Sequence, residues 1–521
     1  MSGASGRAGA KWLLGVAAVA LIAAAFAVTR IRSTPTLCTA STRLASTLTQ
    51  SLDIEAFVFR GTPTLDRFVI DLEALLRRYE AAGKGNVHVR IRDSKDPATR
   101  NDAIQSGLNE LSFGEPTDGD SATIVTGHMG IVLKYGAEKD LIAALSPDNA
   151  LGLEFWITSK LRELRAKAEG RVFRVGVLTG HDELKLTESN FMSTGQVSIA
   201  SVITQNVPYY QFVDVDLRAG EQEIDDALVG LIVTQPGKDL TEKELRRIDR
   251  FVMRGHPLAV FAGAANVRAG DATMQATLST HGLERLLGGY GMEMGRDVVI
   301  DTAQPVRVTA STHRGVVSVA FPSFVEASSD PAKGGGARML DPSHPVFFRL
   351  DTLGLPFASS IELKPARQPG ASIRALARSS AQAERATSDT VDLRPSQTWP
   401  APASPQQVVL AAVASGRLSS AFPSGDKMGI DAPARSTKDT RVVLIASSQF
   451  LANPVQRAAR APSAAPAAFP TGGDEALLML SPSYAQNKLI NTILAFKNTL
   501  DYLGFEDDFT ECLPTGADAG R

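Results

Sequence analysis

The stretch VFRVGVLTGHDE, residues 172–183, decides the fold class. Its first seven residues are mostly apolar, which is typical of a short strand that is buried on both faces of a sheet. The polar residues that follow form a turn at the carboxyl end of this strand. Further strands of the same kind are expected at residues 210–215, 228–233, 258–262 and 441–446.

Helical patterns separate these strands. The sequence TEKE, residues 241–244, has the spacing of a capping box and opens a helix that ends near Gly255. Residues 486–503 carry apolar side chains on one helical face and form a last helix. Alternating strands and helices predict an α/β fold, with a mostly parallel sheet that is covered by helices on both faces.

The region before this block contains a smaller unit of the same class. Residues 53–59 alternate apolar and polar side chains, as a half-buried strand does. Thr64 is expected to cap the next helix, and residues 87–91 form a second strand. With a strand at 131–135 and a helix at 151–168, this βαβ unit has the layout of a thioredoxin-like domain. Since the sequence has no Cys-x-x-Cys pair, redox catalysis on that fold is excluded.

An uninterrupted run of apolar and small residues covers residues 12–28, with two basic residues on each side. At about 1.5 Å per residue, a helix of that length just spans a hydrocarbon core of about 30 Å. Two interpretations are open: an uncleaved anchor, which the length of the run favours, or a signal peptide that is cut after Ala27. Both place the rest of the chain outside the cytoplasm. We therefore expect a single-pass protein of the cytoplasmic (inner) membrane with its bulk in the periplasm.

Changes of pattern along the chain predict five segments. They are a transmembrane anchor (1–36), a thioredoxin-like α/β domain (37–170), the first part of a second α/β domain (171–304), an insertion with short strands and loops (305–440), and a closing strand with a C-terminal helix (441–521).

Several segments resemble the auxiliary extracytoplasmic components of ABC transport systems of the gliding-motility (Gld) type. The matching segments follow the family's order, and in LTGHDE an aspartate, Asp182, replaces a glycine of the family pattern. The resemblance implies that the second α/β domain has a Rossmann-like or glutamine-amidotransferase-like parallel sheet. The matching segments are DLEALLRRY (71–79), LTGHDE (178–183), LTEKELRRIDRFVMRG (240–255), HPV (344–346), LPFASSI (355–361), VLIASSQFLAN (443–453), NTLDYL (498–503) and EDDF (506–509).

Composition and motifs exclude several functions. Lys and Arg number 54 against 56 Asp and Glu in 521 residues, a formal net charge of -2, which argues against nucleic-acid binding. The sequence has no Walker A loop, so the chain is not the ATPase of a transporter. A serine hydrolase would need Gly-x-Ser-x-Gly after a strand, and an amidotransferase would need a cysteine there; neither is present. We expect a non-enzymatic protein without a cofactor.

The most suggestive polar residues follow two of the buried strands. Ligands of open α/β sheets bind in the crevice at the carboxyl ends of the strands, so these residues are candidates for binding a small ligand or a peptide. The alternative, which is favoured, is that they only cap loops. Since the seven histidines are scattered without paired ligand spacing, no metal site is expected. The candidate ligand-binding residues are Thr179, Gly180, His181, Asp182, Glu183, Gln235 and Gly237.

The only cysteines of the chain are Cys38 and Cys512. In an oxidising compartment they are able to pair, but two unpaired thiols are the favoured interpretation because the sequence does not show their proximity.

The resemblance also implies a function and partners. It predicts an auxiliary subunit, for interaction or substrate binding, that associates with an ABC permease and its cytoplasmic ATPase and with the membrane through residues 12–28. One alternative is an envelope hydrolase or ligand-binding protein that uses the crevice near Thr179 and Glu183. Another is an envelope scaffold without a transporter partner.

Overall fold

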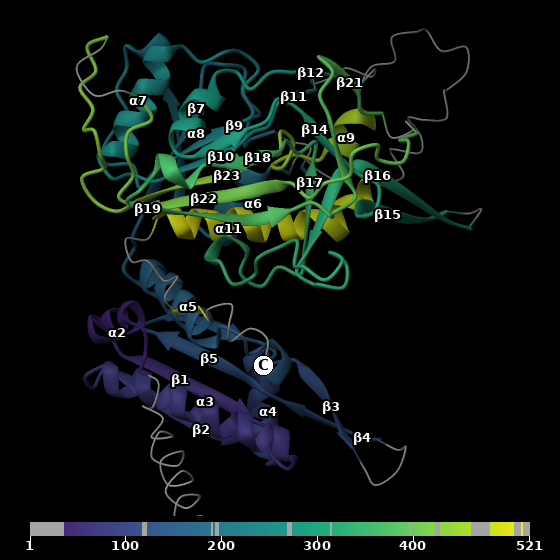
Figure 1. The fold of residues 1–521 in the computed structure, drawn as a ribbon. Helices are drawn as coiled ribbons and strands as arrows, with labels where there is room; N and C mark the ends of the chain where they lie inside the picture. The colour runs from purple at the N-terminus through teal and green to yellow at the C-terminus, as the bar shows by residue number, and fades with distance from the viewer. Residues whose placement is uncertain are drawn as a thin grey trace, which may run out of the picture. The chain divides into compact units, whose positions relative to one another are not determined.

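The chain forms two compact units, Met1–Leu164 and Arg165–Arg521, which are described separately (Figure 1). The computed structural model describes residues 36–116, 122–188, 191–192, 197–267, 274–312, 315–394, 398–422, 428–459, 480–504 and 512–513. The predicted anchor at residues 12–28 lies outside these ranges. Within them, no helix combines the length and the apolar character that are needed to cross a bilayer.

The N-terminal unit alternates helices with strands in its first half and has antiparallel strands in its second half. Its elements are α2 (Thr39–Ser46), β1 (Leu52–Val58), α3 (Pro63–Ala82), β2 (Val87–Asp93), α4 (Pro97–Ser106), β3 (Glu110–Pro116), β4 (Ala122–His128), β5 (Gly130–Tyr135), β6 (Glu138–Ile142), the 3₁₀ turn η1 (Pro147–Asn149) and α5 (Leu153–Ala168), whose last residues belong to the second unit.

The sheet of the N-terminal unit has the order β2-β1-β5-β6. Strands β1 and β2 are parallel, with Leu52 opposite Val87, and α3 connects them, so the predicted βαβ unit is confirmed. Strand β5 is antiparallel to β1, with Leu52 opposite Tyr135. Strands β3 and β4 form a separate two-stranded ribbon, which the sequence analysis did not predict.

The start of α3 corrects the predicted cap. Thr62, and not Thr64, is the N-cap residue, because its Oγ1 accepts a hydrogen bond from the backbone N–H of Leu65 at 3.2 Å. Pro63 occupies the first helical position, where its fixed φ suits a helix and its missing N–H costs nothing. The prediction overlooked this proline.

The second unit contains the longer alternation of strands and helices. Its elements are β7 (Phe173–Thr179), α6 (Ile199–Asn206), β8 (Tyr210–Asp216), η2 (Arg218–Gly220), β9 (Gly230–Thr234), α7 (Glu242–Met253), β10 (Leu258–Phe261), β11 (Ala265–Asn266), β12 (Gln275–Leu278), α8 (Leu283–Gly289), β13 (Met292–Met294), β14 (Val298–Asp301), β15 (Pro305–Thr312), β16 (Gly315–Ser328), η3 (Pro345–Phe347), β17 (Thr352–Pro356), β18 (Ile361–Leu363), η4 (Pro365–Arg367), β19 (Ala371–Arg378), β20 (Ala383–Ala386), β21 (Thr390–Asp392), β22 (Val409–Gly416), β23 (Thr440–Ile445), α9 (Pro454–Ala459), the π-helical turn η5 (Ala485–Leu489) and α11 (Ile490–Gly504).

The main sheet of this unit has a parallel half with the order β8-β7-β9-β10-β23. Numbered along the chain, that order is 2-1-3-4-5, so the direction of strand addition reverses between β7 and β9. Strand β23 lies parallel to β10, with Val442 opposite Leu258, as expected for a closing strand. The carboxyl ends of β7 and β9 are therefore the place where an open sheet of this kind forms its crevice.

Two apolar clusters cover the two faces of the sheet. On β9, Ile232 belongs to the cluster that includes residues of α6 and α11, whereas Leu231 and Val233 belong to the cluster with α7 and α8. Figure 1 shows α11 on one side of the sheet and α7 with α8 on the other. Burial on both faces explains why these strands read as continuous apolar runs in the sequence.

The other half of the main sheet comes from the segment predicted as an insertion. Strand β22 pairs antiparallel with β23, and β18 and β19 both pair with β22. Residues 305–440 therefore contribute strands to the main sheet and also form the three-stranded sheet β15-β16-β17. The second unit has a mixed sheet, where the sequence pattern predicted a mostly parallel one.

Candidate functional site

The predicted ligand-binding residues lie at the switch point of the parallel half. Thr179 is the last residue of β7, and Gly180, His181, Asp182 and Glu183 follow it. Gln235 and Gly237 follow β9, which is the parallel neighbour of β7. The fold thus brings the two predicted groups together.

Backbone hydrogen bonds join the two loops directly. The carbonyl of His181 accepts from the N–H groups of Gly237 at 2.8 Å and Lys238 at 3.0 Å. The N–H of Leu184 donates to the carbonyl of Gln235 at 2.9 Å. A Cβ on Gly237 would lie 3.0 Å from the carbonyl oxygen of Asp182, so only glycine fits without a shift. Between these residues, the loops themselves occupy the crevice.

The imidazole of His181 is buried between two carboxylates. Its Nδ1 lies 3.0 Å from Oε1 of Glu183, and its Nε2 lies 3.0 Å from Oε1 of Glu244. Glu183 also accepts a hydrogen bond from the backbone N–H of His181 at 2.8 Å through Oε2. All three side chains are at most 10% exposed.

Glu244 has a second role, at the start of α7. The backbone N–H and the hydroxyl of Thr241 both donate to Oε2 of Glu244 at 2.8 Å, while the Thr241 hydroxyl accepts from the Glu244 N–H. The predicted capping box is thus confirmed. The contact of Glu244 with His181 was not predicted, because a capping glutamate gives no sign in the sequence that its other oxygen reaches a distant loop.

This geometry limits the chemistry that His181 supports. Both ring nitrogens already face carboxylate oxygens, so neither is directed toward an outside substrate, as a general base requires. The two carboxylates lie at opposite ring nitrogens, so the three groups do not converge on one point as metal ligands do. The arrangement is suited to holding the loop after β7 against the start of α7.

Asp182 and Gly180 form the solvent-facing part of the cluster. Asp182 has a positive φ of 55° and pairs with Lys238, whose Nζ lies 2.8 Å from Oδ2. The hydrogen bond and the charge of Asp182 raise the pKa of Lys238. Gly180 has a φ of 114°, which favours glycine.

Gln235 leads into a second polar network, which the sequence analysis missed apart from Gly263. Its Oε1 accepts from the N–H of Gly263, and its Nε2 donates to Oδ1 of Asn266, both at 2.8 Å. The same Oδ1 lies 2.9 Å from Nε2 of His281, whose Nδ1 lies 2.7 Å from Asp239. These residues are far apart in the sequence and share no motif, so no sequence signal connects them.

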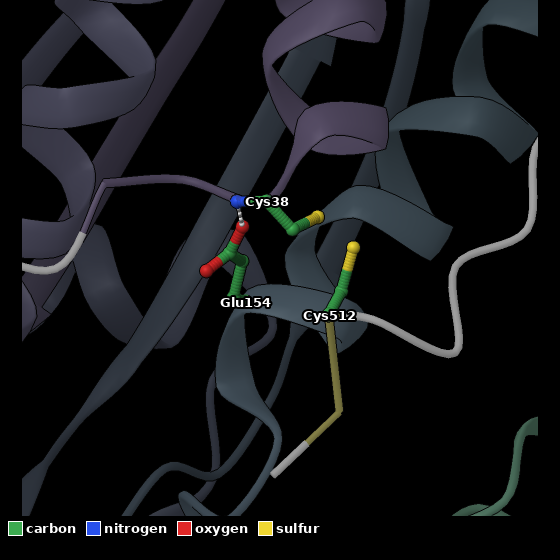
Figure 2. A group of neighbouring side chains, drawn as sticks. All are labelled: Cys38, Glu154 and Cys512. Carbon is green, nitrogen blue, oxygen red and sulfur yellow. Dashed lines mark hydrogen bonds between the residues drawn. The ribbon is translucent and has the colours of Figure 1, made fainter. Parts of the chain in front are cut away.

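Neither cysteine is free: Cys38 and Cys512 are both disulfide-bonded. The favoured interpretation of two unpaired thiols is therefore wrong, because spacing along the chain carries no information on proximity. Figure 2 shows the carboxylate of Glu154 accepting a hydrogen bond from the backbone N–H of Cys38 at 2.7 Å. Sulfur atoms in disulfides are not thiolates, so they do not serve as metal ligands in this state.

Comparison with known proteins gives one match. A family model described as "ABC-type uncharacterized transport system" matches residues 173–479, more than half of the chain. This range begins at β7 and contains every predicted ligand-binding residue. No curated protein matches the chain. The chain therefore belongs to this family of ABC transport auxiliary proteins.

Proposed function

We propose that the protein is a membrane-anchored, extracytoplasmic auxiliary subunit of an ABC transport system of the gliding-motility type. The family match over residues 173–479 carries the proposal, because an accessory role in ABC transport follows from that family. Residues 12–28 attach the chain to the inner membrane, and the two folded units lie on its periplasmic side. The permease and its ATPase are the expected partners.

Two observations support the extracytoplasmic location. Disulfides persist in the periplasm and outside the cell and are rare in the cytosol, and both cysteines of this chain are disulfide-bonded. The apolar run at residues 12–28 has the length of a membrane span. Together they favour a protein that is inserted by its N-terminus and folds in an oxidising compartment.

A non-enzymatic role fits the chemistry of the candidate site. The sequence has no nucleotide-binding loop, so the energy for transport comes from another subunit. The one histidine among the predicted ligand-binding residues has carboxylate oxygens at both ring nitrogens. We infer that the protein acts by binding its partners or its cargo.

The test is co-purification of the tagged full chain from its own host in a mild detergent. We expect the permease and the ATPase subunit to be recovered with it. A matched chain that lacks residues 1–36 but carries an unrelated cleavable signal peptide separates the anchor from the folded units. If the folded units bind the permease, this chain still recovers it; recovery of neither subunit by the full chain contradicts the proposal.

A second measurement tests the location. Cells are treated with a membrane-impermeant maleimide before and after reduction, and labelled Cys38 and Cys512 are counted by mass spectrometry. We expect no label before reduction and two labels after it, in intact cells whose outer membrane has been permeabilised. Labelling that requires lysis of the inner membrane would contradict the periplasmic location.

A further inference from the structure

We propose that the N-terminal unit binds an extended peptide segment of a partner protein as an added strand on the outer edge of β3. This inference is independent of the transport role, because it rests on the geometry of residues outside the matched family range. It concerns a hollow beside β3 that none of the sequence motifs indicated.

The hollow has a volume of about 650 Å³, within the usual range for sites that bind small ligands or several side chains. Its walls come from the first turn of α3, the middle of β3 and the turn η1. The lining residues are Thr62, Pro63, Thr64, Leu65, Leu111, Ser112, Phe113, Ser146, Pro147 and Asp148.

The edge of β3 that faces away from β4 has no partner strand among the described residues. Just before β3, the N–H of Asn109 donates to the carbonyl of Ala143 at 2.8 Å, on the side away from β4. Backbone groups alternate in direction along an extended strand, so the N–H and C=O groups of Leu111 and Phe113 have the same outward direction as the N–H of Asn109. Past Asn109 the two segments separate, and the hollow opens beside these groups.

Unpaired edges of this kind bind extended peptides by strand addition, in which backbone hydrogen bonds supply affinity and pockets for alternate side chains supply specificity. Leu111 and Phe113 offer two outward donor–acceptor pairs, about 6.6 Å apart, which match every second residue of an added strand. Phe113 is held in place by stacking on Phe59, with ring centroids 5.6 Å apart. The edge is therefore a rigid template.

The lining defines the chemistry of the peptide. Leu65 and Phe113 are buried and, with Pro147, give the hollow an apolar wall that suits one apolar side chain. Asp148 is the one charged residue of the lining; it is exposed and forms no ion pair among the described residues. We therefore expect an apolar residue next to a lysine or arginine that faces Asp148.

The experiment uses the purified full chain and a positional library of fluorescein-labelled octapeptides with acetylated and amidated ends. The caps remove the terminal charges, so binding does not report a free carboxylate at the start of α3. The library should select an apolar–basic pair, and Asp148→Asn should weaken the selected peptide several-fold. The tightest peptide is then resynthesised with an N-methyl group at each position in turn.

The N-methyl series gives the sharpest test. In an added strand, N-methylation at every second position removes a hydrogen bond to β3 and should weaken binding about tenfold or more, whereas the positions between should change it little. Because the series alters only the peptide, the fold of the protein is unaffected. A series without this period of two would overturn the proposal.

A matched pair of variants places the site. Thr64→Trp fills the hollow from α3 without touching β3 and should weaken the peptide at least tenfold. Ala74→Trp, on an exposed position of the same helix about 15 Å further along, should leave affinity within twofold. Equal affinity of both variants, or a library without any peptide that binds below about 1 mM, would overturn the proposal.

Discussion

The two units place polar residues at the carboxyl ends of their parallel strands in opposite ways. After β7 and β9, the polar groups satisfy one another: His181 contacts Glu183 and Glu244, and the backbone of the two loops is hydrogen-bonded. After β1, the chain turns into α3 beside a hollow and an unpaired strand edge. The first region is rich in motif residues, and the second has almost none.

This comparison shows that a polar cluster is weaker evidence for binding than unused hydrogen-bonding capacity beside open space. A buried group that already has its partners gains little from a ligand, whereas an outward backbone donor gains a full partner. The predictions below test the difference, beginning with the group whose removal leaves the most buried charge unpaired.

The largest effect is expected for His181→Ala. Without the imidazole, the carboxylates of Glu183 and Glu244 remain buried without their shared partner, which should lower the free energy of unfolding by about 3–5 kcal/mol. Urea unfolding of the C-terminal unit, followed by Trp399 fluorescence with Trp12 and Trp156 replaced by Phe, measures it. Asp182→Ala, at the exposed end of the cluster, should change stability by about 0.5 kcal/mol or less. A stable His181→Ala protein that has lost function would instead favour a ligand or catalytic site.

Gly237→Ala should destabilise the joined loops by a smaller amount. The added Cβ meets the backbone of Asp182 at 3.0 Å, and overpacking of this kind costs about 1–3 kcal/mol. The same urea experiment measures the change, with the exposed neighbour Lys238→Ala as the control. If the loops had room between them, the two variants would be equally stable.

Asp249 gives a pH-dependent effect. Burial is the main cause that raises its pKa above the ordinary 3.8, against hydrogen bonds from Ser420 and Tyr290 that lower it. As pH rises, the unfolded carboxyl ionises first, so stability is highest below the ordinary pKa and is lost toward the folded one. Each unit of upward shift corresponds to about 1.4 kcal/mol.

The variant Asp249→Asn has no proton to lose and keeps an acceptor for Tyr290. Its free energy of unfolding relative to the unmodified chain should therefore rise from pH 4 upward and then level off. Urea unfolding at half-unit steps of pH between 3.5 and 8 measures this difference. A difference that stays constant over that range would show that Asp249 is not destabilised by burial.

The smallest effect concerns the wall of the hollow. Thr62→Ala removes the N-cap of α3 and should lower the stability of the N-terminal unit by about 1 kcal/mol, whereas Thr64→Ala should change it by less than half of that. Trp156 fluorescence, with Trp12 and Trp399 replaced by Phe, reports this unit. The reverse order of the two variants would restore Thr64 as the cap.

Local patterns in the sequence predicted much of the fold. The apolar run before Thr179 predicted β7, and the capping box at Thr241 and Glu244 predicted the start of α7, because both signals lie within a few residues. The ribbon of β3 and β4 and the addition of β22 to the main sheet were missed. Antiparallel pairs over long separations depend on tertiary packing, which no local period records.

The candidate site was predicted only in part. Its two loops are adjacent, as the position of Thr179 and Gln235 after parallel strands required. The contacts of Glu244 and His281 were missed, because they join residues from different elements. Binding of a ligand at these loops stays a prediction, and the hollow beside β3 had no sequence signal, since it is formed by backbone direction and not by residue type.

The pairing of β10 with β23 has a consequence for biogenesis. Leu258 acquires its neighbour Val442 only after most of the chain has been made, so the edge of β10 stays open during synthesis. Such distant pairing slows folding and leaves an adhesive edge exposed to other nascent chains. Truncated products that end before residue 440 should accordingly aggregate or be degraded, and a chaperone that shields strand edges should raise the yield of the full-length protein.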